Sequence, residues 1–161
     1  MIRPSWDEVW MQVALTVASR SICSRASVGA VIVTRDNRIN STGHNGPPRG
    51  FDHGGVPCSE WCPRAMLGDK TPSYQSCSSI HAETNALVRC DYTQIAGGTL
   101  YCSRAICRDC AKMICNSGIA RVVQIVTTDD AHRAPDEVEE YMRSMGMTVE
   151  RMSGPPIMVK P

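Results

Sequence analysis

Residues 97–123 read GGTLYCSRAICRDCAKMICNSGIARVV and predict a strand, a helix and a second strand in succession. We expect strands at 99–103 and 121–127 around a helix at 107–117, which ends at Gly118. The alternation extends to helices at 80–90 and 135–145, the latter ending at Gly146, and to a short strand at 147–151. Because strands and helices alternate, we expect an α/β fold whose parallel or mixed sheet carries helices on both faces.

The N-terminal part predicts one helix and one β-hairpin. Ser5 and Glu8 form a capping box, and an apolar helix face follows from Trp6, Val9, Trp10, Val13, Ala14 and Val17. The run VGAVIVT at 28–34 is rich in β-branched residues and leads through 35–37 into a second strand at 38–43. The stretch from 45 to 79 is expected to be irregular.

Length and composition predict a single compact domain at 1–161, with about 47–79 as an irregular insertion. The formal net charge of +1 argues against a broad nucleic-acid surface but allows a small anionic ligand. No apolar run approaches the ~20 residues that span a bilayer, and the first ten residues, MIRPSWDEVW, lack a signal-peptide profile. We expect a cytoplasmic protein with no membrane or nucleic-acid partner. The nine cysteines are expected to be reduced thiols, because the chain shows no export signal and their spacings are typical of metal ligands.

Three residues have the type and spacing of a zinc site: His81, Cys107 and Cys110. A catalytic zinc takes three protein ligands and keeps a fourth position open, whereas a structural zinc is usually closed by four side chains. An open zinc site makes hydroxide available near neutral pH without a strong base. The set therefore predicts one catalytic Zn2+.

Glu83 is a nearby carboxylate that need not bind the metal. Residues two apart on a helix point to nearly opposite faces, so His81 and Glu83 converge only if His81 lies at the helix cap. Ser78 and Ser79, just ahead of it, are candidates for capping the helix. We expect Glu83 to move protons between water, a ring nitrogen and a departing ammonia.

Neither His81-Ala82-Glu83 nor Cys107-Arg108-Asp109-Cys110 identifies a catalytic zinc site when taken alone. C-x-x-C is also found in redox pairs and structural zinc half-sites, and it arises by chance in cysteine-rich chains. Cys107 and Cys110, however, share one face at the start of the expected helix, where the positive helix end favours thiolates. H-x-E followed by C-x-x-C, each opening a helix, is the signature of zinc-dependent nucleobase deaminases.

Further stretches extend this likeness over most of the chain: Cys23-Ser24-Arg25 leading into VGAVIV, STGHNGPPRG at 41–50, HAETNAL at 81–87, and the block at 97–123. The chain resembles the deoxycytidylate deaminases of the cytidine deaminase superfamily. The resemblance implies a three-layer α/β/α fold with a central mixed five-stranded sheet, and hydrolysis of dCMP to dUMP for thymidylate synthesis. It also implies a homo-oligomer, commonly a hexamer, that dCTP activates and dTTP inhibits.

Carried over by position, the resemblance makes His81, Cys107 and Cys110 zinc ligands and Glu83 the proton shuttle. It makes Asn45 a contact to the substrate's sugar or base, beside Ala82, although Asn45-Gly46 is also typical of a plain turn. Candidates for binding the phosphate are Arg25, Arg49 and Arg104, each of which is alternatively a solvated surface charge.

The chain departs from the family pattern at three places. Ile106 stands where proline usually precedes the first cysteine ligand, His44 where tyrosine is common, and Arg104-Ala105 differ from the usual run. These positions lie near the expected substrate and effector surfaces. A 5-modified dCMP, a free (deoxy)cytidine and another aminated heterocycle therefore stay open as alternative substrates. An inert zinc-stabilised module is the non-enzyme alternative, against which the presence of Glu83 argues.

The irregular segment suggests a second, structural zinc. Cys58 and Cys62 have zinc-compatible spacing, and Cys77 and Cys23 lie just before expected regular elements. We expect these four cysteines to bind it, with His53 as a substitute for Cys23 or Cys58; free loop thiols are the alternative. A metal clip would offset the ordering entropy of a long loop that has little to bury.

Overall fold

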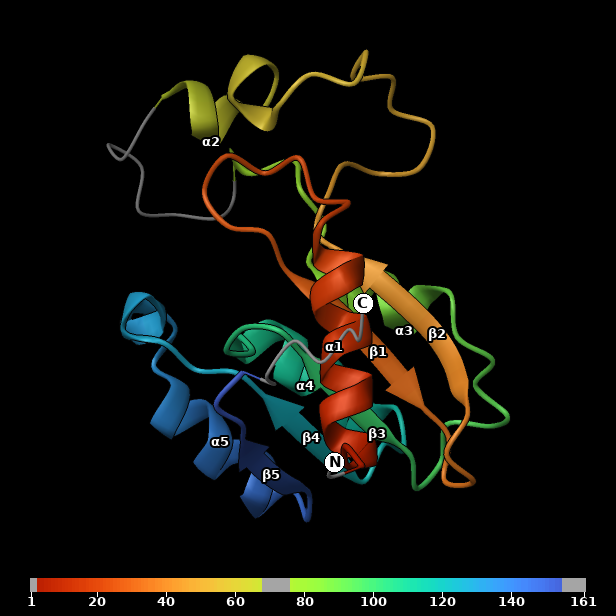
Figure 1. Ribbon diagram of the computed structural model, residues 1–161. Coiled ribbons are helices and arrows are strands. Elements are labelled where there is room, and N and C mark those ends of the chain that lie inside the picture. The colour runs from red at the N-terminus through yellow and green to blue at the C-terminus, as the bar shows by residue number, and fades with distance from the viewer. Residues whose placement is uncertain (1–2, 68–75, 155–161) are drawn as a thin grey trace.

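A five-stranded mixed sheet forms the centre of the computed structural model, which describes residues 3–67 and 76–154 (Figure 1). The strand order is β2-β1-β3-β4-β5, with β1 antiparallel to β2 and β3, and β3, β4 and β5 parallel. The strands are β1 (Gly29–Val33), β2 (Ile39–His44), β3 (Thr99–Cys102), β4 (Arg121–Gln124) and β5 (Thr148–Arg151). The expected hairpin and mixed sheet are confirmed.

Helices cover both faces of this sheet (Figure 1). One face packs against α1 (Trp6–Ala18) through a cluster that includes Met11, Val31 and Tyr101. The other face packs against α3 (Ala82–Val88), α4 (Arg108–Asn116) and α5 (Pro135–Ser144). The three-layer α/β/α architecture is therefore confirmed.

The first helix begins as predicted and buries most of the predicted face: Trp10 and Ala14 are buried, and Val9 and Val13 pack against the same cluster. Ser5 and Glu8 form the capping box, since the Glu8 backbone N–H donates to the Ser5 hydroxyl and the Ser5 N–H donates to the Glu8 carboxylate. Trp6 was expected on the apolar face, and this prediction is wrong: the side chain is 53% exposed and stacks on Trp10. Met11, which was not predicted to be buried, is fully buried, because the helix packs on the sheet through Trp10, Met11 and Ala14.

Several chain ends meet at one edge of the sheet. Ala30, at the start of β1, pairs with Gly43 near the end of β2 and with Cys102 at the end of β3. Cys102 in turn pairs with Gln124, the last residue of β4. The loops that leave β2, β3 and β4 therefore start side by side, which is where open α/β sheets place their ligands.

The segment between β2 and α3 is irregular, as expected. In its described part the helical elements are the short η1 (Cys58–Glu60) and α2 (Pro63–Met66). Residues 68–75 of the expected insertion lie outside the described residues. The helices of the described residues include none long and apolar enough to cross a membrane.

The strand predicted at 121–127 ends three residues early, at Gln124. Thr127 begins a 3-10 helix instead, η4 (Thr128–Arg133), because its hydroxyl and backbone N–H both bond to the Asp130 carboxylate. Gly118 and Gly146 follow the ends of α4 and α5 with φ of 87°, as predicted for residues that close helices. The η4 segment therefore follows the end of β4, at the edge of the sheet where the loops start.

Candidate active site

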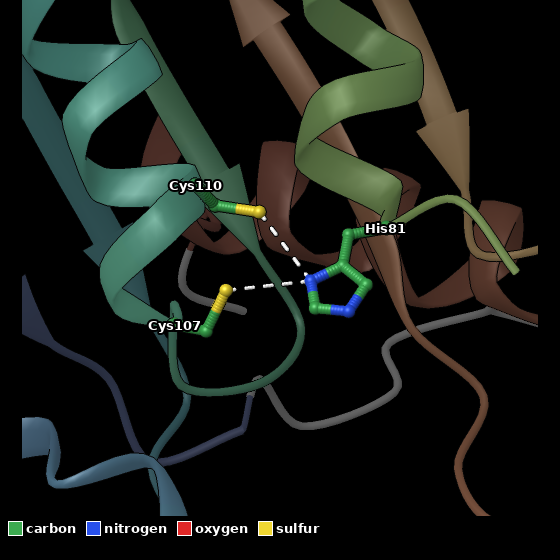
Figure 2. A group of neighbouring side chains, drawn as sticks. All are labelled: His81, Cys107 and Cys110. Atoms are coloured by element: carbon green, nitrogen blue, oxygen red, sulfur yellow. Dashed lines mark hydrogen bonds between the residues drawn. The ribbon is translucent and has the colours of Figure 1, made fainter. Parts of the chain in front are cut away.

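His81, Cys107 and Cys110 converge although 26 residues separate the histidine from the first cysteine (Figure 2). The Nδ1 atom of His81 lies 3.4 Å from the sulfur of Cys107 and 3.4 Å from that of Cys110. Their three ligand atoms all lie within 4.8 Å of one another, and among residues 3–67 and 76–154 no other group of three such residues does so. The predicted ligand set is therefore assembled.

Helix starts place all three side chains. His81 is the N-cap of α3 and has extended backbone angles, φ −67° and ψ 153°, as the H-x-E spacing required. Cys107 is the N-cap of α4 with φ −81° and ψ 163°, and Cys110 lies in the first turn of the same helix. The prediction that Ser78 or Ser79 caps α3 is wrong, because His81 occupies the cap and no side chain bonds to it there.

The start of α3 is tied to the end of β2. The Gly46 N–H donates to the Ile80 carbonyl at 3.1 Å, and the Ile80 N–H donates back to the Gly46 carbonyl at 2.8 Å. Gly43 lets the strand approach the helix, since a Cβ at this position would lie 2.2 Å from the carbonyl oxygen of Ala82. This contact fixes the residue directly before His81.

The close contacts among Cys107, Cys110 and His81 shift the pKa of each of these groups. The hydrogen bond with the Cys110 thiol, together with His81, lowers the pKa of Cys107 to about 4. The same hydrogen bond and burial raise the pKa of Cys110, while the contact with Cys107 raises that of His81. One nitrogen and two sulfurs match the donor set of a catalytic zinc, and the described group contains no fourth protein ligand.

Glu83 lies beside the metal group without joining it. Its side chain is 1% exposed, and its Oε1 atom makes no hydrogen bond to any described residue. Burial raises the pKa of this carboxyl group. Glu83 lines a cavity of about 680 Å³ together with His81, so its buried oxygen is available to a molecule bound there.

Residues 4–126 match the family model described as the cytidine and deoxycytidylate deaminase zinc-binding region. The chain belongs to this deaminase family. The matched residues include α1, Glu83 and the group of His81, Cys107 and Cys110, whose side chains are of the type that binds zinc.

Relatives in the family share much of the sequence. The deoxycytidylate deaminase of Mycobacterium phage D29 is 43% identical over 129 residues, which are 76% of this chain and 96% of that protein. The deoxycytidylate deaminase of Saccharomyces cerevisiae is 36% identical over 157 residues, but the chain spans only 46% of its length. The crystal structure of the dCMP deaminase from cyanophage S-TIM5 in complex with dCMP and dUMP is 28% identical, with a TM-score of 0.72 over 94% of this chain and 100% of that one.

Most of the predicted substrate residues line the same cavity: Arg25, Asn45, Ala82 and Arg104. Asn45 is 8% exposed, and its side chain is already bonded to backbone, accepting from the Val28 N–H at 2.8 Å and donating to the Ala26 carbonyl at 2.9 Å. It thus shapes the cavity wall at residues 26–28. Arg49, in contrast, is exposed and is not among the residues that line the cavity.

The four cysteines predicted for a second zinc are only partly brought together. The sulfurs of Cys62 and Cys77 lie 4.0 Å apart. Cys58 instead packs against Ser24, whose backbone N–H donates to its sulfur at 3.1 Å. The substitute His53 accepts a hydrogen bond from the Gly55 N–H at Nδ1. The described residues contain no second group of three ligand atoms within 4.8 Å, so the second zinc stays a prediction.

The cavity residues of η4 were not among the residues predicted from the sequence. Asp129, His132 and Arg133 line the cavity, and Asp130 is buried beneath them. The signal was present, because Thr127 followed three residues later by an acidic residue is typical of a helix start. The β-branched run at 121–127 concealed it.

Proposed function

We propose that this chain hydrolyses dCMP to dUMP and ammonia, replacing the 4-amino group of the cytosine ring by oxygen from water. The observation that carries the proposal is the buried Glu83 Oε1, which has no partner among the described residues and lies in the cavity beside the His81, Cys107 and Cys110 group. A structural metal site has no use for such a carboxylate, whose burial is costly. The inert-module alternative is therefore disfavoured.

The protein's own residues account for the proton transfers. A zinc ion held by His81, Cys107 and Cys110 would supply a Lewis acid that lowers the pKa of water towards neutrality. Glu83 accepts the proton of the attacking water at its carboxylate and delivers it to the ring nitrogen. The Glu83 carboxylate then takes the proton of the new hydroxyl group at C4 and passes it to the amino group, so that the C4=O bond forms as the C4–N bond breaks and ammonia leaves. Because His81 is the N-cap of α3 and Glu83 lies two residues later in its first turn, one element aligns the metal ligand and the proton carrier.

The substrate class is supported by the relatives and by the cavity. The phage D29 and yeast relatives are named deoxycytidylate deaminases, and the S-TIM5 enzyme was solved with dCMP and dUMP. The cavity lining contains four arginines, at positions 25, 64, 104 and 133, against the carboxylates of Glu83 and Asp129. An excess of positive charge favours an anionic substrate over a free nucleoside.

The test is an assay of the purified, zinc-loaded protein with dCMP, 5-modified dCMP, deoxycytidine and cytidine in parallel. We expect dCMP to be converted, with loss of the cytosine absorbance and release of one ammonia per dUMP. Turnover of cytidine without turnover of dCMP would overturn the proposed substrate, and preference for a 5-modified dCMP would reassign it.

We also propose the second zinc, with Cys62 and Cys77 as two of its ligands. The 4.0 Å separation of their sulfurs supports a shared metal. Metal analysis should then give about two zincs per chain, and the double substitution Cys62→Ser/Cys77→Ser should remove one of them while dCMP turnover at the first site persists. A stoichiometry near one in the wild type contradicts this second site.

The resemblance to deoxycytidylate deaminases supports three further proposals, a homo-hexamer, activation by dCTP with inhibition by dTTP, and a cytoplasmic location. Light scattering coupled to gel filtration tests the first. Titration of dCTP and dTTP into the dCMP assay tests the second, and a flat response contradicts it. Fractionation of the source cells tests the third.

A further inference from the structure

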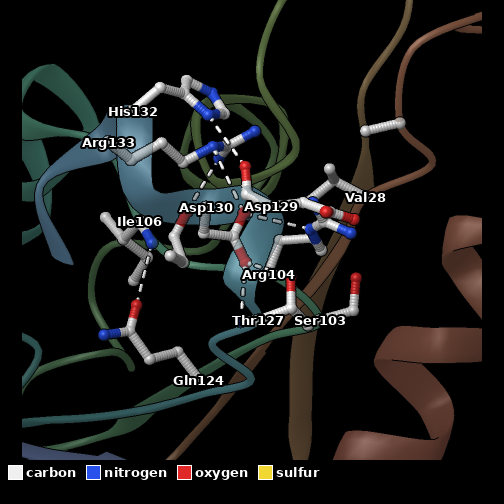
Figure 3. Close-up of polar contacts among 12 residues, drawn as sticks. Val28, Ser103, Arg104, Ile106, Gln124, Thr127, Asp129, Asp130, His132 and Arg133 are labelled. Carbon is white, nitrogen blue, oxygen red and sulfur yellow. Dashed lines mark hydrogen bonds and ion pairs between the residues drawn. The ribbon is translucent and has the colours of Figure 1, made fainter.

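Asp130 is a fully buried carboxylate beneath the cavity, in the η4 segment (Figure 3). Its Oδ2 accepts hydrogen bonds from the backbone N–H and the hydroxyl of Thr127, both at 3.0 Å. Its Oδ1 accepts from Nε of Arg104 at 3.1 Å and lies 3.6 Å from Nε of Arg133. A buried charge persists only when it is paired and hydrogen-bonded, so these contacts hold Asp130 and both arginines in one arrangement.

Arg104 and Arg133 differ in the hydrogen bonds that their terminal guanidinium nitrogens make. Arg133 donates from Nη1 to the Ala105 carbonyl at 2.7 Å, and its side chain is only 10% exposed. Arg133 is therefore committed to the loop between β3 and α4. Arg104 is 23% exposed, and its terminal nitrogens make no hydrogen bond to any described residue. Asp130 thus holds Arg104 by Nε and leaves its two terminal nitrogens to the cavity.

A guanidinium presented in this way has a specific chemical complement. Two terminal N–H groups bind two oxygens of a phosphate or carboxylate bidentately. Arg104 lines the same cavity as Glu83 and His81, so a single bound molecule can reach both ends. The cavity of about 680 Å³ lies in the range that takes a nucleotide-sized ligand.

We propose that Asp130 is a positioning residue that aims Arg104 at the 5′-phosphate, and that this pair makes the site selective for a nucleoside monophosphate over the nucleoside. The inference rests on the proposed dCMP deaminase function and specifies how the anionic end of that substrate is recognised. It also gives Arg104 and Arg133 separate tasks, phosphate binding for the first and loop support for the second.

The first experiment compares kcat/KM for dCMP and for deoxycytidine in Arg104→Gln. Hydrogen bonds to a charged group are strong, so we expect a loss of roughly 30- to 100-fold with dCMP, mostly in KM, and a change of less than about threefold with deoxycytidine. Arg104→Lys should recover part of the loss, because it keeps the charge without the paired donors. Arg38→Gln is the matched control, since Arg38 forms an exposed ion pair with Asp36 on the β1–β2 turn.

The second experiment tests the positioning role with Asp130→Asn and the double variant Asp130→Asn/Arg104→Gln. We expect Asp130→Asn to weaken dCMP use about tenfold through KM, with deoxycytidine much less affected. The double variant should be no worse than Arg104→Gln alone, because Asp130 acts through Arg104. Equal losses with both substrates, or fully additive losses, would show a merely structural role and overturn the positioning claim. Should Asp130→Asn fail to fold, Arg104→Gln still decides the phosphate claim.

Binding of the product separates this inference from the proposed function. Calorimetry should show that the wild type binds dUMP more tightly than deoxyuridine and that Arg104→Gln loses this preference. If the wild type deaminates no cytosine compound, the proposed function fails, and the dUMP preference alone decides the phosphate site. An equal response of Arg104→Gln and wild type to dUMP overturns the site in either case.

Discussion

The backbone N–H of Ile106 donates a hydrogen bond of 2.8 Å to Oε1 of Gln124, directly before the first cysteine of the metal group. Both residues are buried, and Nε2 of Gln124 continues the chain of bonds to Glu139. Proline is usual at position 106 in the family that the chain resembles, and proline has no N–H to donate. A hydrogen bond donated to the neighbouring strand β4 therefore holds this turn, which a proline ring would otherwise stiffen.

Replacing Gln124 by leucine should loosen the loop that carries Cys107. The change leaves the Ile106 N–H buried without an acceptor, which costs about 1–3 kcal/mol of unfolding free energy. Zinc affinity should fall roughly tenfold, because groups that orient metal ligands have effects of that size. Urea unfolding and chelator competition measure the two effects. Lys112→Ala, exposed on the same helix, is the control, and unchanged zinc affinity in Gln124→Leu would refute the orienting role.

Introducing the family's proline at position 106 should be harmful here. Ile106→Pro removes the N–H and leaves Oε1 of Gln124 without its buried donor, so we expect a loss of about 1–3 kcal/mol in the free energy of unfolding. Combined with Gln124→Leu, the proline should cost little more, since no N–H then needs an acceptor. Strictly additive losses in this double-mutant cycle, measured by urea unfolding, contradict the coupling.

Gly43→Ala should displace the helix that carries His81 and Glu83. An added Cβ would lie 2.2 Å from the Ala82 carbonyl oxygen and 2.4 Å from the Ala86 nitrogen, both backbone atoms. We expect a loss of about 3 kcal/mol or more in unfolding free energy and weaker zinc binding. Gly46→Ala is the matched control, because its Cβ would only touch the His44 ring at 3.6 Å. Similar behaviour of the two variants would contradict the packing argument.

Protonation of Asp7 at low pH should lower the free energy of unfolding. Arg121 donates to both Asp7 oxygens, at 2.8 and 2.6 Å, and this contact lowers the pKa of Asp7 in the folded state. A lowered folded pKa means that the contribution is present above the unfolded pKa of about 3.9 and is lost as pH falls through the folded value. Because Asp7 is partly exposed, we expect only about 1 kcal/mol. Asp7→Asn should narrow its stability gap from wild type between pH 6 and pH 3 in urea unfolding, and a constant gap would refute this.

Much of the fold could be predicted from local pattern. The β-branched run at 28–34 and the alternation after residue 97 predict the strands, because burial on a sheet selects those side chains. The H-x-E spacing predicted where the helix begins, because His81 and Glu83 can converge only if His81 lies outside the helix. The catalytic set was recognisable because zinc chemistry restricts ligand types and count.

The rest depends on tertiary contacts that no local pattern contains. Trp6 is exposed and Met11 is buried because the packing of α1 on the sheet decides where the edges of its buried face lie. Arg49 lies outside the cavity lining, which its residue type could not indicate, because an arginine binds a phosphate or faces solvent equally well. Asp130 could not be predicted as a site residue, because it acts through its contact with Arg104, which is 26 residues away in the sequence.

Glu83→Gln tests the central claim most directly, because glutamine keeps the shape of the side chain and cannot carry the proton. The account predicts unchanged zinc content at the His81, Cys107 and Cys110 site, an unchanged fold by circular dichroism, and a fall in dCMP turnover of at least about 10²-fold. Glu140→Gln, exposed on α5, should behave as the wild type. Turnover of dCMP by Glu83→Gln within tenfold of the wild-type rate, at equal zinc content, would contradict the account.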